Sequence, residues 1–226
     1  MTDANIVKAH CNQCLRETRH FVVAVEKQEY NEENPDGSLG YWEHTYYEML
    51  KCCGCENITL RSTLHVAGDP ERRATYFPPA VTRPKPRWMS GLVGLSAPAI
   101  NRALVSLFHE VYAALHAGSN RLAMMGARAI IDMVLLDKVG DQGTFAEKLS
   151  EMQKADYISR ASREFLAAAI EAGHAATHRG HASNDADVNR VMDIVENLVQ
   201  TVYVLETAAR TLHKNTPRRS TKPPAP

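Results

Sequence analysis

The sequence has no excess of either charge and no long apolar run, and each absence excludes a class of protein. Its 26 basic and 26 acidic side chains cancel, so no overall field draws the chain to nucleic acid or to an anionic membrane, and a nucleic-acid role needs a local basic patch. No stretch reaches the roughly 18 consecutive apolar residues of a membrane-spanning helix, and the first residues lack the apolar core of a signal peptide. We therefore expect a cytoplasmic protein without a membrane segment.

Cysteine is scarce, but its five residues fall in two close sets. Cys11 and Cys14 form one CxxC pair, and Cys52 and Cys55 form a second pair with Cys53 between them. Without an export signal, this spacing favours a metal over disulfides, because two tight turns can each present two thiolates to one tetrahedral Zn²⁺. We predict one structural zinc ion bound by these four residues, with Cys53 a bystander. Four unpaired buried thiols are the alternative.

The segments around the cysteines predict a small β zinc ribbon over residues 1–68. Residues 21–30 and 41–50 are rich in strand-forming side chains and flank a polar turn, and a third such run spans 58–66. The aromatic side chains of the second run are Tyr41, Trp42, Tyr46 and Tyr47. They offer a stacking surface for nucleic acid, or they pack the ribbon or dock it on the rest of the chain. His10 is a less favoured substitute zinc ligand.

Residues 69–90 predict a linker, because their many prolines suit neither a helix nor a central strand. The segment also carries the best basic patch in the chain. Its basic residues are Arg72, Arg73, Arg83, Lys85 and Arg87. A solvated tether is the favoured interpretation of this patch.

Residues 91–214 predict a helical bundle, because their apolar side chains recur at helical spacing. The first helix would begin at Ser96–Pro98 and end before Gly118. Four more helices are expected over about 119–139, 144–152, 159–179 and 185–212. The third begins with a capping box at Thr144 and Glu147. Residues 215–226 have no apolar anchor and are expected to be disordered.

The end of the predicted fourth helix carries three histidines. His174, His178 and His181 are spaced i, i+4, i+7 and would line one stripe. The carbonyl oxygens at a helix end favour a protonated imidazole, so His178 or His181 could act as an acid near neutral pH. Gly173, inside this helix, predicts a close contact with a neighbouring helix. A packed and hydrogen-bonded stripe is the alternative.

Several helical segments match a known pattern: Tyr112-Ala-Ala-Leu115, NRLAMMGARAIIDMVL, Phe145-Ala-Glu-Lys-Leu149, the Gly173-to-His178 spacing and a long helix ending at Leu205. Through them, residues from about 97 to 205 resemble a bacterial and phage domain-of-unknown-function family related to the HEPN (higher eukaryote and prokaryote nucleotide-binding) helical domains. Members of this family often carry an N-terminal zinc ribbon. The resemblance implies an α+β fold class, with a small β zinc ribbon followed by an all-α HEPN-like helical bundle.

Many HEPN domains are metal-independent ribonucleases that place an arginine four to six residues before a histidine. This chain departs from that pattern, so the implied site is rearranged: His178 moves the proton, and Arg179 or Arg128 holds the phosphate. Asp132 would orient Arg128, and His174 would lie beside them. The resemblance implies a nucleic-acid-interacting protein, an RNase effector of an antiviral defence or toxin-type system. The alternative is a non-enzymatic dimeric scaffold whose ribbon recruits a protein partner.

The last predicted helix, residues 185–212, carries apolar side chains on more than one stripe, including Tyr203 and Val204. One stripe would pack the bundle and leave another for a partner. We therefore expect a homodimer through the helical domain. His178 and Arg179 would then lie at a concave surface near Arg128 and Asp132, where two chains meet.

Overall fold

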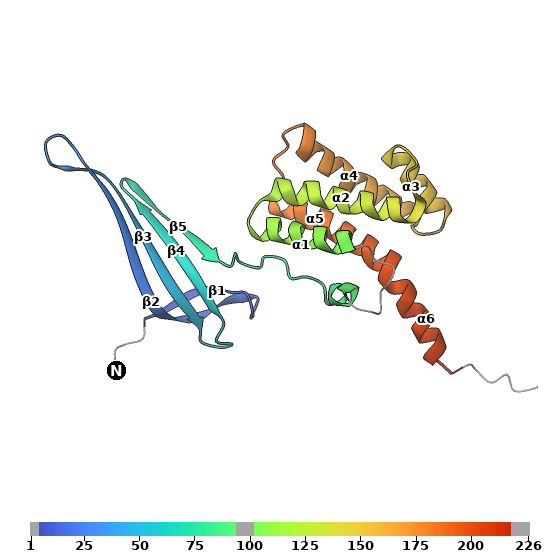
Figure 1. The fold of residues 1–226 in the computed structure, drawn as a ribbon, viewed down its shortest axis with the longest axis horizontal. Helices are drawn as coiled ribbons and strands as arrows, with labels where there is room; N and C mark the ends of the chain where they lie inside the picture. Colours follow the sequence, from blue (N-terminus) through green and yellow to red (C-terminus); the bar gives the residue numbers. More distant parts are fainter. Residues whose placement is uncertain (1–4, 94–101, 218–226) are drawn as a thin grey trace, which may run out of the picture. The chain divides into compact units, whose positions relative to one another are not determined.

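The computed structural model describes residues 5–93 and 102–217, and the chain divides into two compact units, residues 1–84 and 85–226 (Figure 1). The predicted helix start at Ser96–Pro98 lies outside the described residues, as does the predicted tail from residue 218. Among the described helices, none has both the length and the apolar character needed to cross a membrane.

The first unit is a single antiparallel sheet in which each strand pairs with the next along the chain. Its strands are β1 (Ile6–Cys11), β2 (Arg16–Glu33), β3 (Leu39–Cys52), β4 (Ile58–Val66) and β5 (Asp69–Phe77). Figure 1 shows that β2 and β3 form a long hairpin that extends past the neighbouring strands. The sheet is therefore a meander with β1 and β5 at its two edges.

The overall α+β class holds, but the predicted combination of a small zinc ribbon and a HEPN-like bundle is wrong. Five strands, with β2 and β3 spanning 18 and 14 residues, replace the small ribbon. Residues 69–77, predicted as the start of a linker, form β5. Pro70 is compatible with this strand because β5 is an edge strand, where a missing N–H need not break a ladder.

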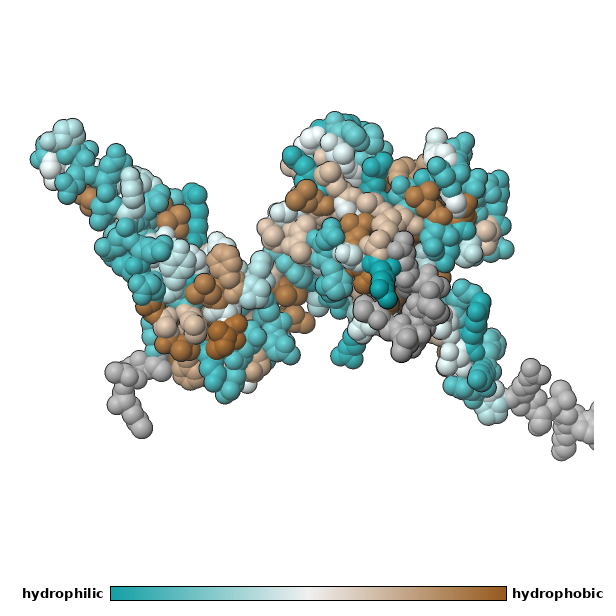
Figure 2. All heavy atoms as spheres, in the orientation of Figure 1, coloured by the Kyte–Doolittle hydropathy of each residue, from teal (hydrophilic) through white to brown (hydrophobic). Residues whose placement is uncertain are grey.

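The buried side chains of the sheet gather at the end that carries the cysteines. They are Ala9, Cys11, His20, Leu50, Cys52 and Thr59. The distal parts of β2 and β3 contribute no buried side chain, since residues 21–49 are all half-buried or exposed, and the far end of this hairpin is mostly hydrophilic (Figure 2). So small a core contributes little hydrophobic stabilisation, and sheets of this kind depend on additional cross-links such as a metal.

The second unit is helical. Its elements are the 3₁₀ segment η1 (Arg87–Val93), α1 (Arg102–His116), α2 (Asn120–Val139), α3 (Phe145–Lys154), α4 (Arg160–His178), α5 (Asp185–Val199), the π-helical segment η2 (Gln200–Leu205) and α6 (Glu206–Asn215). Helix α2 is central and packs against α1, α3, α4 and α5. Fully buried Phe108, Ile130, Ile131 and Met192 lie in the core. The fifth predicted helix is found as the continuous run of α5, η2 and α6.

Two local predictions in this unit are confirmed. Thr144 accepts a hydrogen bond from the backbone N–H of Glu147, whose side chain accepts one from the N–H of Thr144, which is a complete capping box. Gly173 lies against α2, where an added Cβ would stand 2.7 Å from the Cβ of Arg128 and 3.1 Å from the carbonyl oxygen of Met124. Glycine is therefore what allows α2 and α4 to approach so closely.

Candidate functional site

The four paired cysteines come together at one end of the sheet. Cys11 ends β1 and Cys14 lies in the turn that follows, while Cys52 ends β3 and Cys55 lies in the turn before β4. The register of β1, β2 and β3 places these two turns side by side, with His20 of β2 opposite Cys52. All four sulfurs lie within 4.8 Å of one another, and no disulfide joins them.

This spacing fits a tetrahedral metal ion. Four sulfurs at about 2.3 Å from one zinc ion are about 3.8 Å apart, and the sulfurs of Cys11 and Cys55 are 3.4 Å apart. The described chain therefore holds a group of four soft ligands with the geometry of a possible metal site.

The ionisation of the sulfurs also fits a cation. The Thr18 hydroxyl, 3.4 Å from the Cys52 sulfur, and the backbone N–H groups of Cys55 and Gly54 lower the pKa of Cys52 to about 5. The pKa of Cys14 is raised to about 12, chiefly by its sulfur contacts with Cys55 and then with Cys11. Four thiolates so close together repel one another, and a divalent cation would offset that repulsion.

The sequence neighbours of the four cysteines lie outside the cluster. Cys53 is exposed and lies outside the cluster, as predicted for a bystander. His10, the predicted substitute, is also outside it. Asn12, between the first two cysteines, donates from Nδ2 to the Pro79 carbonyl at 3.0 Å and accepts from the Val81 N–H at 2.8 Å. The first cysteine turn thus fixes the chain that follows β5.

One face of the sheet gathers aromatic and basic side chains, and we call it the Tyr46 face. Residues directly opposite on antiparallel strands share a face, and Tyr46 is opposite Lys27 on β2 and Thr63 on β4. The same register adds the other members: Trp42, His44, Glu48, Arg61, His65 and Ala74. A shallow hollow of about 370 Å³ lies on this face, lined by Tyr46, Glu48, Arg61, Thr63, His65, Arg72 and Ala74.

The rings of the Tyr46 face contact one another and remain half-exposed. The ring centres of Tyr46 and His65 are 5.0 Å apart, and those of Trp42 and His44 are 4.6 Å apart. The ammonium nitrogen of Lys27 lies 5.5 Å from the centre of the Tyr46 ring. These rings are held in place by neighbours, and part of each surface stays open to a ligand.

The acidic partners on this face limit its positive charge. Nε of Arg61 is 2.7 Å from Oε2 of Glu48, and this carboxylate raises the pKa of Arg61 further. Lys27 forms an ion pair with Glu29. Two of the cations on the face are therefore locally neutralised, so the rings are its more prominent binding groups.

The four aromatic residues predicted as one stacking surface divide between the two faces of β3, because side chains alternate along a strand. Trp42 and Tyr46 lie on the Tyr46 face, whereas Tyr41 and Tyr47 lie on the other. Tyr47 donates to Oε1 of Gln28 at 3.2 Å, and Tyr41 donates to Glu43. Sequence reasoning missed the basic members from β2 and β4, although the period of two in β3 could have shown which aromatic residues share a face.

The predicted histidine stripe lies at the exposed end of α4. His174 and His178 are both exposed, with ring centres 4.7 Å apart. Arg179, which follows the helix, forms an ion pair with Glu171 and lowers the pKa of that carboxyl group. His181 lies in the next loop, where its N–H donates to the Ala175 carbonyl at 3.2 Å. The stripe is therefore accessible, while the Arg179 charge is directed at Glu171.

Arg128 and Asp132, the other predicted catalytic residues, have partners on α3. The guanidinium carbon of Arg128 lies 4.8 Å from the centre of the Phe145 ring. Asp132 accepts a hydrogen bond of 2.8 Å from Nζ of Lys148. The predicted pairing of Arg128 with Asp132 is thus replaced by contacts to α3. The structure brings together His174, His178 and Arg179, and it turns the other two side chains toward another helix.

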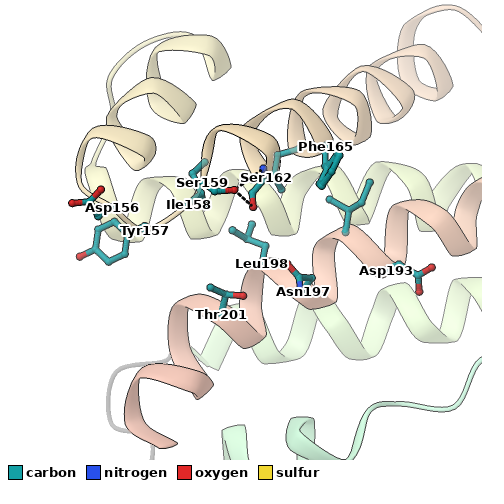
Figure 3. A pocket seen from close by; sticks show the side chains of 12 residues that line it. Asp156, Tyr157, Ile158, Ser159, Ser162, Phe165, Asp193, Asn197, Leu198 and Thr201 are labelled. Atoms are coloured by element: carbon teal, nitrogen blue, oxygen red, sulfur yellow. Dashed lines mark hydrogen bonds between the residues drawn. The ribbon is translucent and has the colours of Figure 1, made fainter. Parts of the chain in front are cut away.

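A separate hollow of about 570 Å³ lies between α4 and α5 (Figure 3). Its apolar lining includes Phe165, Leu166 and Leu198, and Asp156 and Asp193 are its charged members. A hydrogen bond joins the hydroxyls of Ser159 and Ser162 beside it (Figure 3), but none of the predicted catalytic residues lines it. The hollow and the histidine stripe are therefore distinct features of the helical unit.

Comparison with known proteins gives a family match that lies within the helical unit. Residues 109–215 match the model of a family described as a domain of unknown function (DUF4145). No curated protein and no solved structure matches the chain. The predicted resemblance to a domain-of-unknown-function family is therefore confirmed over these residues.

Proposed function

We propose that the four cysteines bind one structural Zn²⁺ ion. The support is the set of four sulfurs within 4.8 Å of one another, a soft donor set that zinc commonly takes in structural sites. With four protein ligands no coordination position remains for water, so the ion would cross-link the two turns of the sheet and perform no reaction. Reduced thiols of this kind fit the cytoplasm.

We also propose that the N-terminal unit binds single-stranded nucleic acid on the Tyr46 face. The observation that carries this proposal is the set of half-exposed rings of Trp42, His44, Tyr46 and His65 on one face. Unpaired bases stack on such rings, whereas the bases of a duplex are not available for stacking. Arg72, at the hollow, provides a cation for the phosphate backbone.

Fluorescence anisotropy of a labelled short RNA tests this proposal with a matched pair of variants. Tyr46→Ala removes a ring from the binding face, and Tyr47→Ala removes one from the opposite face of the same strand. Loss of one stacked base costs about 1–3 kcal/mol, so Tyr46→Ala should weaken binding about 5- to 150-fold. Tyr47→Ala should bind as the wild type does. Equal affinities for all three proteins would refute the proposal, and preference for a duplex would contradict the stacking argument.

An RNase activity is a second proposal, and one observation favours it. His174 and His178 are exposed side by side at the end of α4. His178 would move the proton at the ribose 2′-hydroxyl or at the leaving oxygen, as the resemblance to HEPN ribonucleases of defence systems implies. Arg179 would reach a phosphate only by leaving Glu171.

Incubation with total and transfer RNA in the presence of a chelator tests the RNase proposal. His178→Ala should abolish cleavage without changing the melting temperature, because His178 is exposed. Cleavage that persists in this variant would rule out His178. The alternative is a non-enzymatic scaffold, and it is favoured because Arg128 and Asp132 contact α3 instead of the histidines. The absence of cleavage by intact protein would support this alternative.

A further inference from the structure

The beginning of α2 is a helix terminus with three backbone donors that have no partner in the described part of the chain. The first three backbone N–H groups, those of Asn120, Arg121 and Leu122, precede the first hydrogen bond of the helix, from the Ala123 N–H to the Ser119 carbonyl. The Ser119 side chain forms no capping bond, and no acidic residue occupies the first turn. This 20-residue helix therefore presents unoccupied donors and the positive end of its dipole.

A hollow of about 410 Å³ lies at this terminus. It is lined by Gly118, Ser119, Asn120, Arg121, Leu122, Ala182 and Ser183. Two segments far apart in the sequence thus form it: the turn between α1 and α2, and the loop between α4 and α5. Nδ2 of Asn120 joins them by donating to the Ser183 carbonyl at 3.3 Å and to Oδ1 of Asp185 at 2.7 Å.

Ser183 provides an independent indication of a ligand. The residue is only 8% exposed, and its buried Oγ has no hydrogen-bond partner among the described residues. A buried hydroxyl without a partner carries a cost in folded-state stability. The same residue lines the hollow. A bound acceptor would remove this cost, because the hydroxyl can donate to it.

Arg121 adds a full positive charge to the site. Its side chain is exposed, and among the described residues it has no ion-pair partner. The carboxylate that belongs to this region, that of Asp185, already accepts the Asn120 amide. An ion at the hollow would therefore meet backbone donors, a hydroxyl and a guanidinium, beside one unpartnered acceptor, the Oδ1 of Asn120. Such donors hold phosphate at helix N-termini.

We propose that this hollow, with Arg121, Ser183 and the first N–H groups of α2, is a binding site for a phosphate group. The phosphate belongs to a small phosphorylated molecule or to a nucleic-acid backbone. The site is independent of the Tyr46 face, since all of its residues lie in the helical unit. Arg121 attracts and orients the phosphate, and the buried donors hold it in place.

The test measures the melting temperature of the full chain in inorganic phosphate and in chloride at matched ionic strength. Phosphate should raise it in a saturable way in the wild type and in Arg210→Ala, which removes the same charge from α6. Arg121→Ala and Ser183→Ala should lose this rise. Ser183→Ala should be at least as stable as the wild type without phosphate, because it removes an unpaired hydroxyl.

Two further ligands separate the sources of the phosphate. Adenosine monophosphate and a single-stranded RNA without terminal phosphates are titrated into Tyr46→Ala, in which the other proposed surface is disabled. Binding of the monophosphate that needs Arg121 indicates a small molecule, and binding of the RNA that needs Arg121 indicates a backbone. The proposal is overturned if phosphate gives no saturable rise, or if the rise persists in both Arg121→Ala and Ser183→Ala. A destabilised Ser183→Ala that still responds to phosphate would show that the hydroxyl is structural.

Discussion

Replacement of Gly173 by alanine should destabilise the helical unit, although alanine is the better helix former. The new Cβ would stand 2.7 Å from the Cβ of Arg128 and 3.1 Å from the Met124 carbonyl oxygen. Neither atom is the end of a flexible side chain, because one is attached directly to the α2 backbone and the other belongs to it. Relief of the clash therefore requires α2 and α4 to move apart along the buried surface that they share.

Two opposing effects set the size of this change. Alanine within a helix gains about 1 kcal/mol over glycine, whereas overpacking of a well-packed contact costs about 1–3 kcal/mol. Gly173→Ala should therefore lower the free energy of unfolding by about 1 kcal/mol. Gly173→Val should lower it further, since its branched side chain adds two more carbons at the same contact.

Urea unfolding followed by far-ultraviolet circular dichroism measures this difference, because the helices lie in the second unit. Ala168→Gly, on the exposed surface of the same helix, is the matched control. It should lose about 1 kcal/mol and so report the helix-propensity contribution alone. A Gly173→Ala protein that is stabilised by about 1 kcal/mol, the propensity gain without a packing cost, would refute the close approach of the two helices.

Three further predictions concern polar contacts of the helical unit. Thr144→Ala should cost about 1 kcal/mol of unfolding free energy at neutral pH. The Thr144 hydroxyl, and to a lesser extent the Thr144 backbone N–H, lower the pKa of Glu147 from its usual 4.5, so the cost of the substitution should shrink as the pH of the unfolding experiment falls below 4.5. Tyr203→Phe, which removes the 2.7 Å hydrogen bond to Asp137, should lower the urea midpoint by an amount equivalent to about 1 kcal/mol. Lys148→Met should cost about 2 kcal/mol by leaving Asp132 unpaired, and adding Asp132→Asn should recover part of that loss in a double-mutant cycle.

Features set by a few neighbouring residues were predictable from the sequence. The CxxC spacing predicted the cluster of four sulfurs, because each pair is presented by a single turn. The capping box at Thr144 and the close approach at Gly173 were likewise found, since each depends on one residue type at one position of a helix. These are local geometric requirements that a short stretch of sequence contains.

Features that depend on the rest of the sheet were not predictable in the same way. The prolines of residues 69–90 indicated a linker, but β4 offers its free edge to residues 69–77, and an edge strand tolerates Pro70. The strand-forming runs indicated only a small ribbon. Mutual pairing extends β2 and β3 past these runs by two to five residues at each end, because each strand satisfies the backbone groups of the other.

The partners of side chains in the helical unit were the least predictable feature. Spacing of i, i+4 favoured a pair between Arg128 and Asp132. Instead, Arg128 lies over the ring of Phe145 and Asp132 accepts a hydrogen bond from Lys148, both residues of α3. Tyr203 indicated a second apolar stripe for a homodimer, but its ring is half-buried and its hydroxyl bonds to Asp137 of the same chain. The homodimer stays a prediction that light scattering can test. Contacts between distant elements, rather than helix periodicity, decide such partners.

Elemental analysis of the purified chain tests most directly the claim that a zinc centre holds the sheet together. The account predicts one zinc ion per chain in the wild type and in Cys53→Ser, whose exposed sulfur lies outside the cluster. Cys52→Ser should lose the metal and lower the melting temperature of the sheet, because it removes one of four ligands. A wild-type metal content well below one per chain, or a Cys52→Ser protein that keeps both its zinc and its melting temperature, would contradict the claim.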